Sequence, residues 1–235
     1  LIAAGKSDEM DSTGRVSDRT TRAELYDPAT GTFSFAGQYA GSIGYADAPV
    51  MTTMLPDGKV LLAGENPAQV YDPSTDTFTF TGEIVGMGWR YAATTLMDGT
   101  VLITPREGDL WCSPPANAEI YHPSDGTFLV AGAMTKLVGS ITLLRDGSVL
   151  FAGGGGSPCD VSDTAELYVP PTRSFVAIGR MRQSRTEHAA TLLRDGSMLI
   201  TGGRGSWGYA AGPALASAEL YRPAEPRPRQ RAVRH

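Results

Sequence analysis

The residue types best suited to binding chemistry gather in two short stretches of the sequence, GWRYAAT and SRTEHAAT. The first contains Trp89, Arg90 and Tyr91, and the second contains Arg185. An Arg guanidinium donates paired hydrogen bonds to a carboxylate, and aromatic rings offer flat stacking surfaces. These side chains therefore favour binding of a saccharide, a peptide or an acidic group. Further aromatic candidates stand in segments that are predicted to be loops: Trp111, Trp207 and Tyr209.

A second group of side chains suits metal-assisted hydrolysis. Glu187 and His188 are adjacent in SRTEHAAT, and Asp47 lies in GYADAPV. Carboxylate and imidazole groups of this kind hold a divalent metal and activate water. Ser140 and Ser184 are the serines to test as nucleophiles beside His188, but the sequence has no GxSxG elbow to support one. Hydrolysis is therefore an alternative, with a structural role as the simpler interpretation of His188.

Residues 6–18, KSDEMDSTGRVSD, are rich in oxygen-bearing side chains. Asp8, Glu9 and Asp11 have spacings that offer ligands to Ca²⁺. The stretch lacks the Gly and the final Glu of an EF-hand loop, so a solvated acidic loop is the favoured interpretation. No cofactor is predicted, and Ca²⁺ and Zn²⁺ are the metals to test.

Composition narrows the class of protein and its partners. The chain has 235 residues and a formal net charge of −5. An acidic chain lacks the basic face that neutralises phosphates, which argues against nucleic acid as a partner. No apolar run reaches the ~18 residues of a membrane-spanning helix. The two cysteines, Cys112 and Cys159, are predicted either to form one disulfide or to remain free thiols.

An eleven-residue motif recurs along the chain and sets its organisation. The first four copies end in Phe, seven residues after a Tyr, whereas the fifth copy has lost this aromatic residue. The Glu of AELY recurs with the motif, so a structural role is predicted for it. The copies are AELYDPATGTF (23–33), AQVYDPSTDTF (68–78), AEIYHPSDGTF (118–128), AELYVPPTRSF (165–175) and AELYRPAEPRP (218–228).

A hairpin signal precedes each of the last four copies. Apolar runs rich in Val, Leu, Ile and Thr flank an Asp-Gly pair, as in VMTTMLPDGKVLLAG (50–64) and HAATLLRDGSMLITGG (188–203). Gly adopts the positive φ of a tight turn at little cost, so each stretch predicts two antiparallel strands. The Tyr and Phe segments supply a third and a fourth strand, joined by a Pro-containing turn. Four antiparallel strands in every 45 to 53 residues predict an all-β fold, a β-propeller with one blade per repeat.

The ordered hairpin, Gly pair, Tyr and aromatic residue resemble the kelch repeats of bacterial proteins and of the central domain of galactose-oxidase-like enzymes. Two features depart from that pattern. Phe stands where the family usually has Trp, and AGEN (63–66) and ITPR (103–106) lack the second Gly. The resemblance implies four-stranded antiparallel blades, each with its first strand innermost. It also implies a binding site at one mouth of the central channel, built from the loops that carry the candidates above.

Copper radical oxidases share the kelch propeller, but the sequence argues against that activity. Tyr121-His122 is similar to a Tyr-His copper pair, yet Tyr121 is the repeat Tyr and His122 replaces the Asp of YDP. The chain has three His, one of which is His235 in the C-terminal tail. A site that needs two His and a radical Tyr is therefore not readily assembled.

The predicted propeller covers residues 1–223 and has about five blades, with incomplete terminal blades. The first repeat lacks an innermost strand, the last lacks a fourth strand, and residues 224–235 are predicted to be a disordered, Pro- and Arg-rich tail. Three explanations stay open: an imperfect five-bladed ring, a fragment of a larger secreted kelch protein, or a homo-oligomer completed through exposed strand edges. The repeats span approximately residues 1–40, 41–85, 86–133, 134–181 and 182–223.

The leading prediction is a binding module whose channel mouth presents Arg and aromatic residues to a saccharide, a peptide or an acidic group. Metal-assisted hydrolysis is the alternative. The family resemblance and the disulfide interpretation favour a secreted or periplasmic location over a cytoplasmic one. The predicted binding residues are Trp89, Arg90, Tyr91, Arg185, Glu187, His188, Trp111, Trp207 and Tyr209.

Overall fold

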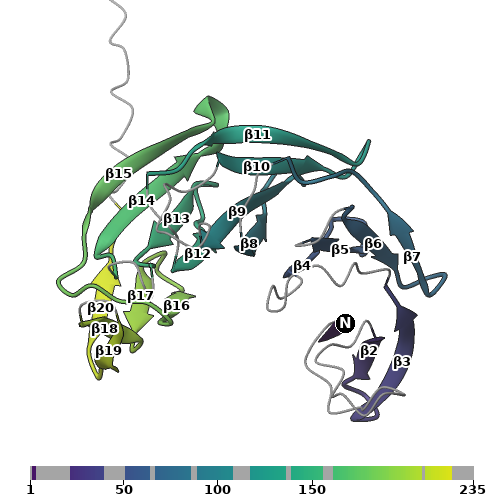
Figure 1. Cartoon of the computed structure of the whole chain (residues 1–235), viewed down its shortest axis with the longest axis horizontal. Helices are drawn as coiled ribbons and strands as arrows, with labels where there is room; N and C mark the ends of the chain where they lie inside the picture. Colours follow the sequence, from purple (N-terminus) through teal and green to yellow (C-terminus); the bar gives the residue numbers. More distant parts are fainter. Residues whose placement is uncertain are drawn as a thin grey trace, which may run out of the picture.

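The protein forms an arc of antiparallel β-sheets that follow one another in chain order (Figure 1). In this computed structural model the described residues contain twenty strands and one short 3-10 helix, η1 (Pro170–Thr172). This architecture confirms the predicted all-β, propeller-type fold. The structure describes residues 2–3, 22–39, 51–63, 67–85, 89–107, 117–135, 139–155, 161–207 and 210–223.

Three complete four-stranded sheets make up the middle of the arc. They are termed blades 2, 3 and 4, and in each the strands pair in the order in which the chain visits them. Blade 2 consists of β4 (Met51–Met54), β5 (Val60–Ala63), β6 (Gln69–Asp72) and β7 (Thr77–Phe80). Blade 3 consists of β8 (Trp89–Thr95), β9 (Val101–Glu107), β10 (Asn117–His122) and β11 (Thr127–Ala133). Blade 4 consists of β12 (Ser140–Leu143), β13 (Val149–Ala152), β14 (Thr164–Val169) and β15 (Ser174–Arg180).

The two ends of the arc carry three-stranded sheets, as predicted. Among the described residues, blade 1 has no innermost strand and blade 5 has no strand beyond its third. Blade 1 consists of β1 (Ile2–Ala3), β2 (Arg22–Asp27) and β3 (Thr32–Gln38). Blade 5 consists of β16 (Ala189–Leu192), β17 (Met198–Thr201) and β20 (Ala218–Tyr221).

An additional hairpin interrupts blade 5 between its second and third strands. It consists of β18 (Arg204–Trp207) and β19 (Ala210–Ala214), which form a separate two-stranded sheet. The sequence predicts a loop at Trp207, but this residue ends strand β18. The two strands pair antiparallel from Arg204 opposite Ala214 to Trp207 opposite Ala210, with a register shift between Arg204 and Ser206.

The Asp-Gly turns adopt the conformation that the sequence predicts. In the turn between β4 and β5, Gly58 has φ +85° and its N–H donates to the Leu55 carbonyl. The Asp57 carboxylate accepts a hydrogen bond from the Lys59 N–H at 3.1 Å. A side chain other than Gly would be strained at this φ, so the motif fixes the register of each hairpin.

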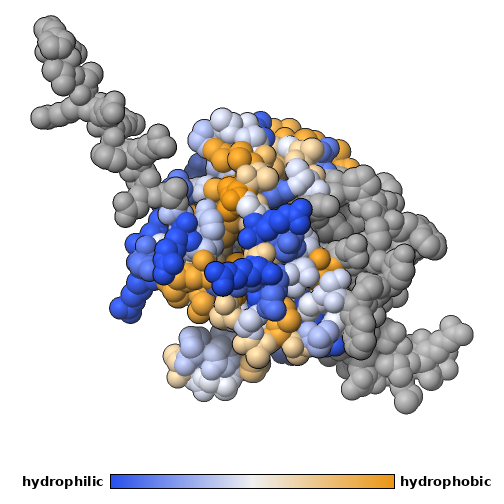
Figure 2. Space-filling view, turned by 90° about the vertical axis from the view of Figure 1, so that its left-hand side faces the viewer, coloured by the Kyte–Doolittle hydropathy of each residue, from blue (hydrophilic) through white to orange (hydrophobic). Residues whose placement is uncertain are grey.

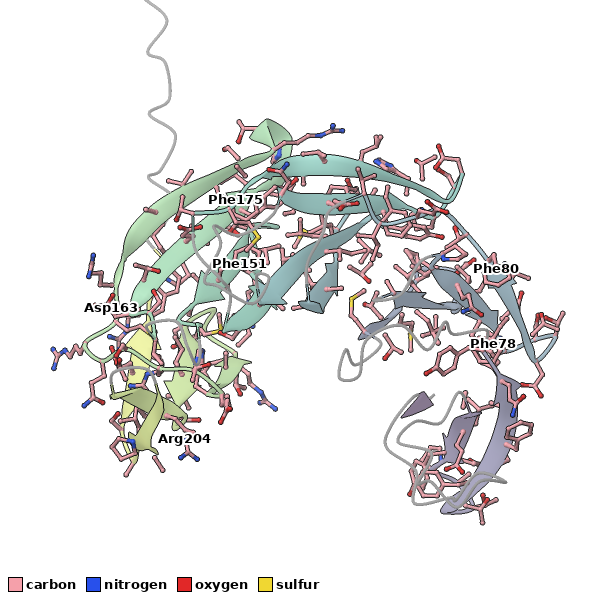
Figure 3. All side chains as sticks on the ribbon, viewed as in Figure 1. Phe78, Phe80, Phe151, Asp163, Phe175 and Arg204 are labelled. Atoms are coloured by element: carbon pink, nitrogen blue, oxygen red, sulfur yellow. The ribbon has the colours of Figure 1, made fainter. Side chains whose placement is uncertain are left out.

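In each of blades 2, 3 and 4, the repeat Tyr and Phe pack against the preceding blade. Tyr121, 2% exposed, belongs to a core cluster with Leu61 and Ala63 of blade 2. Tyr168 lies in the same way against Leu102 of blade 3. Figure 3 labels Phe78 on β7 of blade 2 and Phe175 on β15 of blade 4, two of the fourth-strand aromatic residues. The hydrophobic core therefore consists of clusters that lie between neighbouring sheets. Repeat proteins distribute their stability over such interfaces.

Among the described residues, no helix is long and apolar enough to cross a lipid bilayer.

Candidate functional site

The innermost strands β4, β8, β12 and β16 lie side by side on the concave side of the arc (Figure 1). Two hydrogen-bonded pairs join neighbouring strands: Thr53 Oγ1 and Thr95 Oγ1 are 3.3 Å apart, and His188 Nε2 and Ser140 Oγ are 2.9 Å apart. His188 immediately precedes β16 and Ser140 begins β12, so the starts of these strands meet on one side of the arc. We term this side the mouth: residues 89–91, 139–140 and 185–188, with the β18–β19 hairpin.

The hairpin joins the mouth through backbone hydrogen bonds. The Thr186 N–H donates to the Arg204 carbonyl at 3.0 Å, and the Arg204 N–H donates to the Thr186 carbonyl at 2.9 Å. Arg204 has an exposed side chain, and its Nε donates to the Gly212 carbonyl at 3.2 Å. Arg204 is labelled in Figure 3. This pairing places the strand that ends in Trp207 next to the residues that lead into β16.

Arg185, a predicted ligand-binding residue, is completely buried. Its guanidinium donates to the Gly202 carbonyl at 2.8 Å and to Ser217 Oγ at 3.1 Å, and it forms an ion pair with Glu219 at 2.8 Å. A charge buried this deeply needs such partners to offset its desolvation. These bonds tie the segment before β16 to the segment that leads into β20, so Arg185 stabilises blade 5.

Glu219, the AELY glutamate of blade 5, collects hydrogen bonds from the segment that connects blades 4 and 5. It accepts from the Arg182 N–H at 2.6 Å and from the Gln183 N–H at 3.2 Å, in addition to Arg185. Burial raises the pKa of Glu219, but the hydrogen bonds from Arg182, Arg185 and Gln183 outweigh it and hold the pKa below its ordinary value. Glu119 accepts from the Val85 N–H in the same manner at 3.0 Å. At Glu119 and Glu219 the recurring Glu therefore has the structural role that the sequence predicts.

His188 is 9% exposed and sits in a glycine-lined gap at the inner seam between blades 4 and 5. A Cβ added to Gly139 or to Gly153 would come within 2.9 Å of the imidazole Cε1. The two glycines therefore make room for the ring, and the bond from Nε2 to Ser140 Oγ joins the two blades. This arrangement supports the interpretation in which His188 holds the blades together.

The Ser140–His188 pair has the contact that a serine nucleophile requires, but its surroundings do not suit acyl chemistry. An oxyanion hole needs backbone N–H groups that point at the substrate. Near this pair the N–H groups of Gly139, Gly153 and Gly154 donate to the carbonyls of Gly153, Thr164 and Arg185. These donors are committed to the fold. In the part of the chain that the structure describes, no group of three His, Cys, Asp or Glu residues is arranged to hold a metal.

Glu187 differs from its neighbours because it is exposed and has φ +55°. Positive φ is unusual for a residue other than Gly, and such strain often accompanies functional positions. The mouth therefore presents one exposed carboxylate beside the buried His188 and Arg185.

Several predicted residues lie outside what the structure describes. The structure describes only the backbone of Trp89, Arg90, Tyr91 and Trp207. The first three residues begin β8, and Trp207 ends β18. The candidate metal ligands, two aromatic candidates and both cysteines lie outside the described residues: Asp8, Glu9, Asp11, Asp47, Trp111, Tyr209, Cys112 and Cys159. The tail at 224–235 lies outside them too.

Sequence reasoning missed a pocket of about 160 Å³ between blades 4 and 5. It is lined by Ile178, Gly179 and Met181 from the blade 4 side and by Leu220 and Tyr221 from β20. The sequence did carry a signal for it, because the motif copy of blade 5 lacks the Phe of the other four copies.

Comparison with known proteins gives relatives in structure but not in sequence. No family model and no curated protein sequence matches the chain. A solved structure titled "Structure of YjhT" superposes with a TM-score of 0.63 and 13% identity, and the match covers 94% of this chain and 80% of that one. A fungal alcohol oxidase of the AA5 family, in complex with copper, superposes with a TM-score of 0.53 and 14% identity. This chain spans 60% of the oxidase's length. At these identities the likeness establishes the fold alone: the chain has a β-rich, propeller-type architecture similar to that of these two proteins.

Proposed function

We propose that this protein is a binding module that holds its ligand at the mouth. One observation carries the proposal. The start of β8, the exposed Glu187 and strand β18, which ends in Trp207, lie on the same side of the arc. The buried Arg185 and His188, by contrast, hydrogen-bond to Glu219 and Ser140 within the fold. We therefore assign ligand recognition to the other residues of the mouth, while Arg185 and His188 stabilise blade 5 and its contact with blade 4.

The ligand class follows from the side chains at these positions. Arg90 and the exposed Arg204 offer guanidinium groups that bind carboxylates in a paired geometry. Trp89, Tyr91 and Trp207 supply aromatic rings, which stack on the flat faces of sugars and peptide groups. An acidic saccharide or an acidic peptide segment satisfies both requirements. The proposal needs no cofactor.

A glycan and peptide array, followed by titration of the best ligand, tests the proposal. Arg90→Ala and Trp207→Ala should each weaken binding by about tenfold or more, since a charge-assisted hydrogen bond contributes ~1.5–3 kcal/mol and a Trp that anchors a ligand contributes about 2 kcal/mol or more. Arg194→Ala is the matched control, because Arg194 is exposed but lies in the turn after β16, at the other end of that strand. It should change binding by less than about twofold. An array without any ligand, or equal losses in all three variants, would contradict the proposal.

A further inference from the structure

The fourth strand of each complete blade places an aromatic residue directly opposite the third-strand Tyr. The Cα register pairs Tyr71 with Phe78 and Tyr121 with Phe128. The ring centroids of these pairs are 4.8 and 4.9 Å apart. Tyr168 and Phe175 repeat the arrangement at 5.1 Å. A Tyr–Phe cross-strand pair is therefore a fixed part of the blade.

Each of these Phe rings is seated on a glycine of the preceding blade. A Cβ added to Gly37 would lie 3.5 Å from Phe78, and one added to Gly82 would lie 3.1 Å from Phe128. The Cβ of a residue replacing Gly132 would lie 3.6 Å from Phe175. In all three cases the glycine is in the segment that contains or follows the preceding blade's fourth strand, four residues after that blade's own Phe. The ring therefore packs directly on the glycine: an added Cβ would be in ordinary contact with it at Gly37 and Gly132, and in tight contact at Gly82.

Gly179 is the corresponding glycine of blade 4, but no described residue packs on it. It has φ +143°, close to the +144° of Gly132, and an added Cβ would meet no atom of the described residues within 4 Å. The pocket of about 160 Å³ lies at this point, bounded by Gly179 and by Tyr221 of β20. We term this pocket the socket. Its lining is of the kind that receives an aromatic ring at the other interfaces between blades.

The edge of β20 beside this socket is open in the described part of the chain. β20 pairs with β17, and blade 5 has the strand order β16-β17-β20. Leu220, at the centre of β20, is 39% exposed. An unpaired strand edge offers backbone donors and acceptors to an incoming strand, and an adjacent pocket selects its side chains. Figure 2 shows apolar surface interspersed with hydrophilic side chains on this side of the molecule.

Residues 224–235, which follow blade 5 in the sequence, do not supply the missing ring. Residues 224–235, AEPRPRQRAVRH, contain no Phe, Tyr or Trp, and Pro228 stands seven residues after Tyr221, where the other copies have Phe. Proline also lacks the N–H that a strand donates to its neighbour. A second copy of the chain does not offer a free strand either, because each described fourth strand, β3, β7, β11 and β15, is already paired with its own third strand.

We propose that the edge of β20 and the socket over Gly179 bind an extended segment of a different polypeptide, with an aromatic residue opposite Tyr221. Exposed basic side chains frame the site: Arg182 after β15 and Arg222 after β20, together with Arg180 on β15, which forms an ion pair with Asp163 at 3.2 Å. Acidic residues that flank the aromatic residue of the partner complement this charge. The site is separate from the mouth and does not depend on the function proposed there.

A labelled peptide tests the proposal on the full-length chain. The probe is the chain's own blade 3 sequence, SDGTFLVAGAM (124–134), with fluorescein at its N-terminus. We expect saturable binding by fluorescence anisotropy and at least about a tenfold loss when the Phe of the peptide is replaced by Ala. Equal affinity of the two peptides would overturn the proposal, and this comparison does not depend on any variant of the protein.

A protein variant and a crosslink then locate the peptide. Ile178→Lys places a charge in the socket and should weaken binding by about tenfold, whereas Val130→Lys, an exposed position on β11, should leave it within about twofold. A peptide with p-benzoylphenylalanine in place of Phe should crosslink to residues 178–181 or to Tyr221. Crosslinks elsewhere would refute the site. Binding that strengthens more than about tenfold in a chain shortened to end at Pro223 would show that residues 224–235 occupy the site instead of a separate partner.

Discussion

Blade 1 and blade 3 contain the same Tyr–Phe pair in nearly the same geometry but in opposite environments. Tyr26 and Phe33 have ring centroids 5.0 Å apart with planes inclined by 43°, and Tyr121 and Phe128 have values of 4.9 Å and 47°. Yet Tyr26 and Phe33 are 49% and 57% exposed, whereas Tyr121 and Phe128 are 2% and 7% exposed. The strand register creates the pair locally, and the preceding blade buries it.

This difference shows where the stability of the arc resides. Tyr121 and Phe128 share a core cluster with Met51 and Leu61 of blade 2, so truncating either ring opens a cavity between sheets. No described blade covers the pair in blade 1. In a repeat protein the free energy of unfolding is a sum over units and their interfaces, and the same motif contributes unequally according to its neighbours.

The largest expected effect is the contrast between Tyr121→Ala and Tyr26→Ala. Tyr121→Ala should lower the free energy of unfolding by about 3–5 kcal/mol, because it removes a buried aromatic side chain. Tyr26→Ala loses one cross-strand ring contact and should cost less than about 1 kcal/mol. Urea unfolding followed by circular dichroism measures both. Losses of similar size would mean that the exposed face of blade 1 is covered in solution, and the comparison would fail.

The features that sequence predicted well are those set by neighbouring residues. The Asp-Gly turns, the strands they join and the Tyr–Phe pairs each depend on fewer than about twenty consecutive residues, for which turn conformation and alternation are reliable guides. The loss of Phe from the fifth motif copy also predicted an incomplete last blade.

The role of Arg185 was beyond the reach of the sequence. Its partners Ser217 and Glu219 are 32 and 34 residues away, across two strands and the β18–β19 hairpin. Arginine in a stretch such as SRTEHAAT has the same appearance whether it faces a ligand or an internal carboxylate. Long-range pairing of this kind depends on how the sheet packs around the side chain. The partners of Arg185 could therefore be identified only from the structure.

A second pair of variants sharpens the comparison at the seats of the aromatic rings. Gly132→Ala and Gly179→Ala impose the same backbone strain, since the two residues have φ +144° and +143°. At Gly132 the new Cβ would lie 2.9 Å from the Arg173 carbonyl and close to Phe175, whereas at Gly179 it would meet open space. Gly132→Ala should therefore cost about 1–3 kcal/mol more than Gly179→Ala in the same unfolding experiment.

The difference between these two variants isolates the cost of the contacts that the new Cβ makes at Gly132, chiefly with the Arg173 carbonyl, because the backbone strain cancels. If a partner segment fills the socket over Gly179, its addition should increase the cost of Gly179→Ala towards that of Gly132→Ala. Equal costs in the absence of any partner would indicate that the seat over Gly179 is already occupied.

The smallest expected effect concerns the recurring Glu, which is exposed at Glu24 of blade 1 and hydrogen-bonded at Glu219 of blade 5. The hydrogen bonds hold the pKa of Glu219 below its ordinary value of 4.5, so the unfolded chain binds a proton more readily than the folded one. The stabilisation is present above pH 4.5 and is lost as the pH falls through the lower, folded pKa.

Glu219→Gln should lower the free energy of unfolding by about 1–2 kcal/mol at pH 7. The difference in free energy between wild type and variant should narrow as the pH falls below 4.5. Glu24→Gln is the control and should stay within about 0.5 kcal/mol of wild type at pH 7. A gap for Glu219→Gln that does not change with pH would show that its carboxylate contributes through packing instead of charge.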